Sequence, residues 1–269
     1  MISNKARVER RHLLYCDFLG FSNYSLSKSF DPVKCLRLFR GLDKMVDQAS
    51  VDINPSVAEP ESRRVPDYVV KPEAMYFSDA IVISTPPTNI DAIWLCEAAA
   101  MIQNQICHYG FLIRGSIVTD DVYHSGQTLF GPAIARAAAI EKRGGPPVIV
   151  VSDETLKCFR HAKTQQDKEI VEIREYQLIA CQNSRLRYVD PFWLAKIHTN
   201  QPGIHDRTRA DIDAWRTLIE AGLHNPMRVR RKYSWMARHF NRCLSGKASG
   251  IAPIRYTWWQ RFTQRRQRK

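Results

Sequence analysis

The chain is 269 residues long and 44% hydrophobic, which is enough apolar material to bury one good-sized core. Its seven cysteines are odd in number and show no Cys-x-x-Cys spacing, which disfavours a disulfide framework and a zinc site. No apolar run approaches the ~20 residues of a membrane span, and no apolar stretch follows the basic N-terminus. We therefore expect a cytoplasmic protein with no integral membrane segment.

The positive charge is concentrated at the C-terminal end. Residues 226–269 contain 13 Lys or Arg and no Asp or Glu, which equals the whole formal surplus of +13. The rest of the chain is neutral overall, so a uniformly basic nucleic-acid-binding fold is disfavoured. The basic end is either a solubilising tail or a surface that docks on an acidic partner, nucleic acid or a membrane, with Trp258, Trp259 and Phe262 as apolar anchors.

The first half of the chain has clear apolar periods. They predict a buried strand over residues 12–18 and then a helix of about four turns over 31–46, which opens at Asp31-Pro32. A polar loop or flap is predicted over 50–66, and a two-stranded hairpin over 73–77 and 80–84. The hairpin turn falls at Ser78-Asp79.

The second half alternates helices with strands. The predicted helices cover residues 90–108, 129–142 with a proline near the start, a short segment from Asp153, 208–222 and 227–244. The predicted strands cover residues 111–118, 147–152, 176–182 and 186–190, with a polar turn over 119–128. This order predicts an α+β fold in which a sheet is layered with helices.

Two aspartates stand inside apolar segments. Asp17 lies in the run 11–22, and Asp79 lies in the run 75–84. A buried ionised carboxylate is costly, so each needs a cation or strong hydrogen-bond donors nearby. A shared divalent metal would supply this for both. Asp17 alone would equally fit a strand carboxylate paired with an arginine.

The segments around both aspartates carry a family resemblance. Tyr15-Cys-Asp-Phe-Leu-Gly-Phe-Ser22 resembles the first metal motif of class III nucleotidyl cyclases, and Phe77-Ser-Asp-Ala-Ile-Val82 resembles the second. Further segments resemble one branch, the bacterial Pycsar pyrimidine cyclases of anti-phage defence: Arg114-Gly-Ser-Ile117, Leu129-Phe-Gly-Pro-Ala133, Ala139-Ile-Glu-Lys142 and Lys232-Tyr-Ser-Trp-Met-Ala237. The resemblance covers about residues 10–155, and more loosely 185–245, and depends on the order of the segments.

This resemblance implies a particular architecture. It is a class III nucleotidyl cyclase-like α+β fold with a central, mainly antiparallel sheet flanked by helices and a C-terminal helical extension. The corresponding parts are a catalytic domain over residues 10–200, a helical extension over 201–245 and a basic aromatic tail over 246–269. Class III sites form between two chains, so the resemblance also implies a homodimer.

The resemblance also implies the roles of individual residues. Asp17, Asp79 and the carbonyl of Phe18 would bind two Mn²⁺ or Mg²⁺ ions per site, which prefer oxygen ligands. The backbone of Leu19, Gly20, Phe21 and Ser22 would bind the triphosphate. The other expected substrate contacts are Met75, Tyr76, Arg114, Thr128, Arg136 and Lys142.

Two departures from better-known cyclases concern the base and the transition state. Met75 and Thr128 stand where purine cyclases carry polar or charged base contacts, which favours a smaller or differently held base. Met75 would equally fit as a packing residue under the hairpin. The usual transition-state Asn and Arg are replaced by Ala135 and Ala139. Arg114, Arg136 and Lys142 are the candidate cations, although the last two would equally fit a solvated helix face.

The resulting expectation is a lyase that converts UTP to 3′,5′-cyclic UMP and pyrophosphate, as a second messenger read by a cyclic-nucleotide-responsive effector. Cyclic CMP from CTP is the second possibility, and a purine cyclase is the third. The alternative from another class is a catalytically silent nucleotide-binding module.

Overall fold

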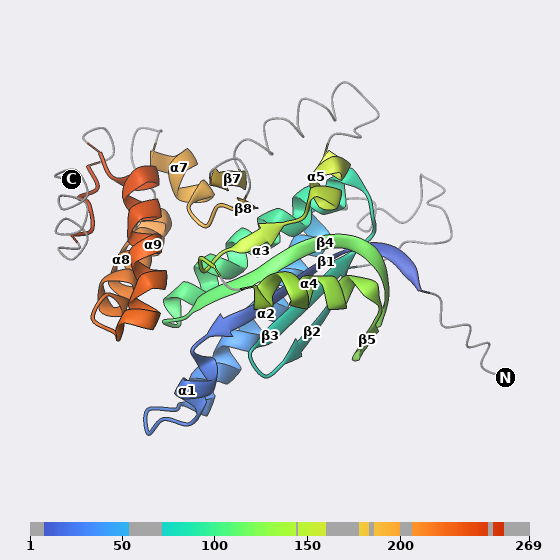
Figure 1. Ribbon diagram of the computed structural model, residues 1–269, viewed down its shortest axis with the longest axis horizontal. Coiled ribbons are helices and arrows are strands. Elements are labelled where there is room, and N and C mark those ends of the chain that lie inside the picture. Colours follow the sequence, from blue (N-terminus) through green and yellow to red (C-terminus); the bar gives the residue numbers. More distant parts are fainter. Residues whose placement is uncertain are drawn as a thin grey trace, which may run out of the picture. The chain divides into compact units, whose positions relative to one another are not determined.

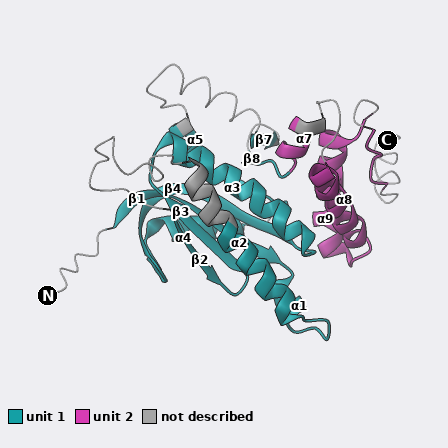
Figure 2. Cartoon of the chain, turned by 180° about the vertical axis from the view of Figure 1, so that it is seen from behind, with its two compact units in different colours: residues 1–191 teal, residues 192–269 magenta. Residues whose placement is uncertain are grey.

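The computed structural model describes residues 8–53, 72–143, 145–159, 178–182, 186–199, 206–246 and 250–255. The chain divides into two compact units, residues 1–191 and 192–269 (Figure 2). The prediction of a catalytic domain, an extension and a tail with boundaries at 200 and 245 stays a prediction. Most of the predicted loop 50–66, the start of the strand 176–182, and the aromatic tail residues Trp258, Trp259 and Phe262 lie outside the described residues.

The first unit is built on an eight-stranded sheet with the order β2-β3-β1-β4-β6-β8-β7, and β5 pairs with β4. The strands are β1 (Glu9–Leu19), β2 (Glu73–Phe77), β3 (Ala80–Thr85), β4 (Leu112–Ser125), β5 (Thr128–Phe130), β6 (Ile149–Val151), β7 (Ile179–Gln182) and β8 (Leu186–Val189). All pairs are antiparallel except β4 with β6. The predicted α+β fold with a mainly antiparallel sheet is confirmed.

Helices cover both faces of this sheet (Figures 1 and 2). They are α1 (Phe21–Ser25), α2 (Pro32–Ile53), α3 (Asn89–His108), α4 (Pro132–Lys142) and α5 (Asp153–Phe159). On one face, Leu13 of β1 and Val118 of β4 are buried with Ala133 and Ala137 of α4. On the other face, the ring of Phe18 stacks on Phe39 of α2 with centroids 5.9 Å apart. Alternate residues of β1 therefore point to different layers.

Two helix starts follow the expected capping chemistry. The Asp31 carboxylate accepts hydrogen bonds from the backbone N–H groups of Val33 (2.9 Å) and Lys34 (3.1 Å), which confirms the predicted cap before Pro32. The Thr88 hydroxyl accepts a bond from the Asp91 N–H at 3.1 Å, so α3 also begins with a side-chain cap. Buried residues lie all around α3, which makes it the central helix of its layer.

Three predicted boundaries were wrong. Residues 119–125 were predicted as a turn but continue β4, because Asp120 and Asp121 lie opposite Arg11 and Arg10 of β1, and opposite charges across two strands favour pairing. The helix that opens at Pro32 runs to Ile53, so it enters the segment predicted as a loop. Leu129 and Phe130, placed near the start of a helix, belong instead to β5, and α4 starts at Pro132.

The second unit contains α7 (Trp193–Thr199), α8 (Asp206–Gly222) and α9 (Met227–Leu244). Its core includes the Phe192 ring, which lies 5.3 Å from Trp215 of α8 and 5.5 Å from Phe240 of α9. The predicted C-terminal helices are confirmed within about two residues at each end. Among the helices that the structure describes, none combines the length and the apolar character needed to cross a membrane.

Candidate functional site

Asp17 and Asp79 are brought together by the pairing of β1 with the β2–β3 hairpin. Asp17 lies opposite Ala80, the residue after Asp79, and the N–H of Phe18 donates a hydrogen bond of 2.9 Å to the Asp79 carbonyl. The hairpin turn needs a left-handed residue, and Ser78 takes that conformation with φ 55°. These backbone constraints place the two carboxyl groups close enough for Asp79 to raise the pKa of Asp17.

The surroundings of this pair are electrically negative. Burial, the neighbouring Asp79 and then Glu141 raise the pKa of Asp17 to about 6, against the opposing effect of Arg114. Burial is also the main cause of the raised pKa of Tyr15, followed by Asp17, Glu141 and Asp79. Several negative groups therefore face one half-buried position, which a cation would stabilise.

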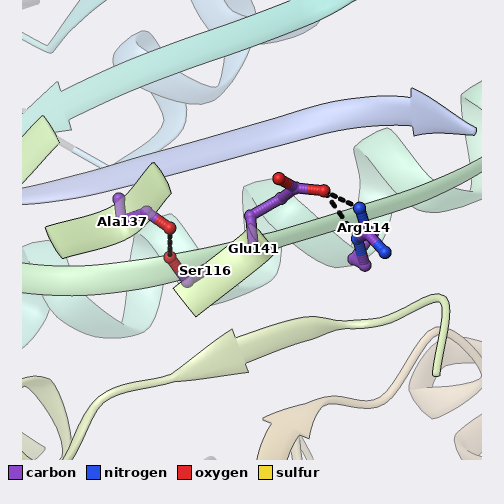
Figure 3. Close-up of polar contacts among 4 residues, drawn as sticks. All are labelled: Arg114, Ser116, Ala137 and Glu141. Atoms are coloured by element: carbon purple, nitrogen blue, oxygen red, sulfur yellow. Dashed lines mark hydrogen bonds and ion pairs between the residues drawn. The ribbon is translucent and has the colours of Figure 1, made fainter. Parts of the chain in front are cut away.

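Arg114 lies beside Asp17, and Figure 3 shows how Glu141 holds it. Asp17 and Arg114 are opposite one another on β1 and β4, so their side chains leave the same face of the sheet. The Arg114 guanidinium donates from Nε to Glu141 Oε1 at 2.7 Å and also from Nη2. Glu141 is only 9% exposed and sits near the end of α4. The ion pair therefore fixes a cation next to the two aspartates.

The backbone expected to bind phosphates follows directly after Asp17. Leu19 ends β1, Gly20 has φ 88°, and α1 begins at Phe21. The left-handed conformation of Gly20 turns the chain sharply from strand to helix, which a glycine permits without steric cost. The Ser22 hydroxyl donates to Asp79 Oδ2 at 3.4 Å, a long hydrogen bond. These four residues lie beside the carboxylate pair, and phosphate binding by them stays a prediction.

Met75 and Tyr76 occupy opposite faces of β2. Met75 lies opposite Val82, which lies opposite Tyr15, and it packs partly buried against the apolar cluster under α4. The Tyr76 ring packs on the other face, 5.9 Å from the ring of Phe39. Met75 is thus on the face of Asp17, and Tyr76 is on the face of Phe18. The packing role of Met75 is seen, and a base contact stays a prediction.

Two of the remaining predicted contacts, Arg136 and Thr128, lie farther from the aspartates within this chain. Arg136 Nε pairs with Asp120 Oδ2 at 2.8 Å. Asp120 is six residues along β4 from Arg114, which is about 20 Å in a strand. Thr128 is exposed at the start of β5, and Lys142 is exposed at the end of α4. Of the three candidate cations, Arg114 is therefore the one placed beside Asp17.

Two residues at the site were missed by the sequence reasoning. Glu141 was quoted as part of a motif without a role, and Tyr15 was read only as an apolar strand residue. Alternation along β1 could have placed Tyr15 on the face of Asp17. Nothing local could have identified the partner of Glu141, because Arg114 lies 27 residues away in the sequence.

The carboxylate pair fits a hard divalent cation that keeps open coordination positions. Mg²⁺ and Mn²⁺ prefer oxygen ligands, and Mg²⁺ is commonly bound by one or two carboxylates together with substrate phosphates. Within the described residues, no third carboxylate, histidine or cysteine completes a group with Asp17 and Asp79 whose ligand atoms all lie within 4.8 Å of one another. Oxygens of a bound nucleotide and of water would fill the remaining positions.

Comparisons with known proteins give structural likenesses only. No protein-family model and no curated protein matches the chain. The adenylyl cyclase CyaB from P. aeruginosa matches with 14% identity and a TM-score of 0.38, over 68% of this chain and 94% of that one. A class III adenylyl cyclase-like ATP-binding protein from Pseudomonas aeruginosa matches with 14% identity and a TM-score of 0.34, over 63% of this chain and 40% of that one. At TM-scores below 0.5, neither likeness identifies the family or the function.

Proposed function

We propose that this chain is a nucleotide cyclase of the class III type that converts UTP to 3′,5′-cyclic UMP and pyrophosphate. The observation that supports it most is the pair Asp17 and Asp79, held together at the end of β1 by the Phe18–Asp79 backbone bond. Two carboxylates beside a strand-to-helix turn suit a metal-bound triphosphate. The resemblance of the segments around both aspartates to cyclase metal motifs leads to the same reaction.

In this reaction the 3′-oxygen of the ribose forms a bond to the α-phosphorus. The bond from the α-phosphorus to the bridging oxygen breaks, pyrophosphate leaves, and the hydroxyl proton passes to solvent. Two Mn²⁺ or Mg²⁺ ions bound by Asp17, Asp79 and the Phe18 carbonyl would acidify the 3′-hydroxyl and neutralise phosphate charge. The backbone of residues 19–22 would orient the phosphates, and Arg114 would face the charge that develops on the leaving group.

Arg114 would also replace the cationic charge of the missing transition-state Asn and Arg. Ala135 and Ala139 cannot donate hydrogen bonds, whereas Arg114 projects beside Asp17 and is fixed there by Glu141. A preorganised cation needs little reorganisation during the reaction, which is the main source of its catalytic value. In this proposal Arg114 is the catalytic cation, and Arg136 and Lys142 contribute less.

A pyrimidine base is favoured by the residues near the hairpin. Met75 packs into an apolar cluster and offers no charged contact to a purine edge. The preference for UTP over CTP follows the Pycsar-like resemblance and not a particular residue. The same resemblance supports a cytoplasmic homodimer whose product signals phage infection to an effector.

The second candidate is a nucleotide-binding module without turnover. It is favoured by the replacement of the usual transition-state Asn and Arg by Ala135 and Ala139. Such a module would bind a nucleoside triphosphate at the same carboxylate pair and release it unchanged.

The testing experiment incubates the purified protein with ATP, GTP, CTP or UTP and Mn²⁺ and resolves the products by mass. We expect cyclic UMP from UTP, and none from the Asp17→Ala variant. Cyclic CMP alone would transfer the proposal to CTP. Nucleotide binding without product, in the presence of Mn²⁺, would favour the silent module and overturn the cyclase.

A further inference from the structure

One side of α9 carries an unbroken stripe of cationic and aromatic side chains. Its residues follow one another at alternating intervals of three and four, which keeps them within an arc of about 80° on a helix of 3.6 residues per turn. The five stripe residues are Arg228, Arg231, Trp235, Arg238 and Arg242. The stripe is about 21 Å long at 1.5 Å per residue. The four arginines are exposed, and Trp235 is half-buried in the middle.

The stripe is held in place by the packing of the opposite side of α9 and by the buried His239. Buried residues of the opposite side of α9, among them Met236, Ala237 and Phe240, pack into the core of the second unit. His239 is 2% exposed and lies beneath two stripe residues. Arg242 Nη2 lies 2.8 Å from His239 Nδ1, and the Trp235 ring lies 5.2 Å from the imidazole. The tryptophan and one arginine are therefore preorganised.

The neighbouring helix α8 shows that this charge pattern is specific to α9. The sequence of α8 mixes four acidic with three basic residues, whereas α9 has six basic residues and no acidic one. A merely solvated helix normally mixes both signs, because pairs four residues apart stabilise it and like charges repel. The sequence of α9 itself supplies no carboxylate, and four exposed arginines along one side of a helix suit a polyanion.

We infer that this stripe binds single-stranded nucleic acid. Arginine forms bidentate hydrogen bonds with phosphate oxygens, and a row of four matches a phosphate backbone. An aromatic ring placed between the cations offers a stacking surface for a base, which is the usual combination in proteins that bind single strands. The same stripe binds the strand without regard to sequence.

A membrane surface fits the stripe less well. Helices that lie on a bilayer insert a large apolar face between the lipids. The apolar face of α9 is buried in its own unit, and its exposed large apolar residues, Met227 and Val229, are confined to the first turn. Along α9 itself a bilayer would therefore be held by charge alone, without the insertion that gives stable binding.

The test measures binding of the full chain to a fluorescein-labelled single-stranded RNA 20-mer by anisotropy, from 50 to 500 mM salt. The Arg228→Gln/Arg231→Gln variant should bind at least about tenfold more weakly at 50 mM salt. Its log–log salt slope should be shallower by about 1.4, since each phosphate contact on a single strand contributes about 0.7. The matched control, Arg207→Gln/Arg209→Gln, removes the same charge from exposed positions of α8 and should change neither value.

A second pair of variants isolates stacking. Trp235→Leu should weaken binding about fivefold or more, and Trp235→Phe should remain within about twofold of the parent. Far-UV circular dichroism and the thermal midpoint confirm that each variant is folded. The inference is overturned if the parent does not bind at 50 mM salt, or if both arginine pairs reduce binding equally. Binding to phosphatidylserine vesicles but not to the RNA would assign the stripe to a membrane surface and overturn it as well.

Discussion

At the scale of single residues, the Arg114–Glu141 pair is the contact that distinguishes this site. Its side chains are 19% and 9% exposed, whereas those of the Arg136–Asp120 pair, also between α4 and β4, are 62% and 15% exposed. An ion pair shielded from water couples more strongly than one in which a partner is solvated. Because both ion pairs join α4 to β4, their coupling energies can be compared directly.

We predict different coupling energies for these two pairs. A double-mutant cycle with Arg114→Gln and Glu141→Gln, measured by urea unfolding, should give a coupling above about 1 kcal/mol. The same cycle with Arg136→Gln and Asp120→Asn should give less than about 0.5 kcal/mol. Equal couplings would show that Glu141 does not hold Arg114 in solution.

His12 belongs to a buried polar network between β1, α3 and β4. Its Nε2 lies 2.8 Å from the Thr88 carbonyl, which only accepts, so Nε2 carries the proton and donates. Nδ1 then accepts from the Thr119 hydroxyl at 2.7 Å. Burial lowers the pKa of His12 to about 4, because the charged imidazolium would be poorly solvated there.

The lowered pKa predicts a stability that falls with acid. Between pH 6.5 and about 4 the unfolded chain binds a proton at His12 and the folded chain does not, so the free energy of unfolding decreases as the pH falls. The loss over this window is about 3 kcal/mol. Unfolding titrations at several pH values should show that His12→Gln, although less stable at pH 7, lacks this part of the pH dependence. A parallel pH dependence in both proteins would contradict the assignment.

At the scale of elements, the sequence predicted most strands and helices but not how far they extend. The hairpin that presents Asp79 was predicted from two short apolar runs around Ser78-Asp79, and both its strands are confirmed. The extension of β4 through Ser125 was missed, because its charged residues resemble a turn until their partners on β1 are known. Glu141 was missed for the same reason, since only tertiary packing supplies its partner.

The close approach of β1 and β4 depends on Gly115. A Cβ at this position would lie 2.1 Å from the Tyr15 carbonyl oxygen and 2.6 Å from Cys16 Cβ. Neither atom can move without shifting β1, the strand that carries Asp17. Gly115 is thus the residue that lets the two site-bearing strands pair.

We predict that Gly115→Ala lowers the free energy of unfolding by about 3 kcal/mol or more, as overpacking in a core does. Gly246→Ala is the control, because a Cβ there meets nothing within 4 Å and its change should stay within about 0.5 kcal/mol. Urea unfolding of both variants gives the comparison. A Gly115→Ala protein as stable as the control would contradict the close packing.

At the scale of the whole molecule, each unit carries a local charged site, and the two sites are opposite in sign. In the first unit, Asp17, Asp79 and Glu141 form a cluster of carboxylates that a cation would stabilise. In the second unit, the arginine stripe of α9 suits an anion. The location of the positive charge was evident from the sequence, since residues 226–269 contain all of the surplus. The helix over 227–244 was also predicted, but the ordering of its charge into one exposed stripe could be recognised only once the buried face of α9 was known.

The most direct test of the central claim is a Mn²⁺ titration followed by electron paramagnetic resonance, with and without UTP. Asp17→Asn and Asp79→Asn should each weaken Mn²⁺ binding at least about tenfold, because each removes one of the two carboxylate ligands. Asp43→Asn, which changes an exposed carboxylate of α2, should bind as the parent does. UTP should tighten Mn²⁺ binding in the parent and not in the two site variants. Equal Mn²⁺ binding by all four proteins would contradict a metal–nucleotide site at Asp17 and Asp79.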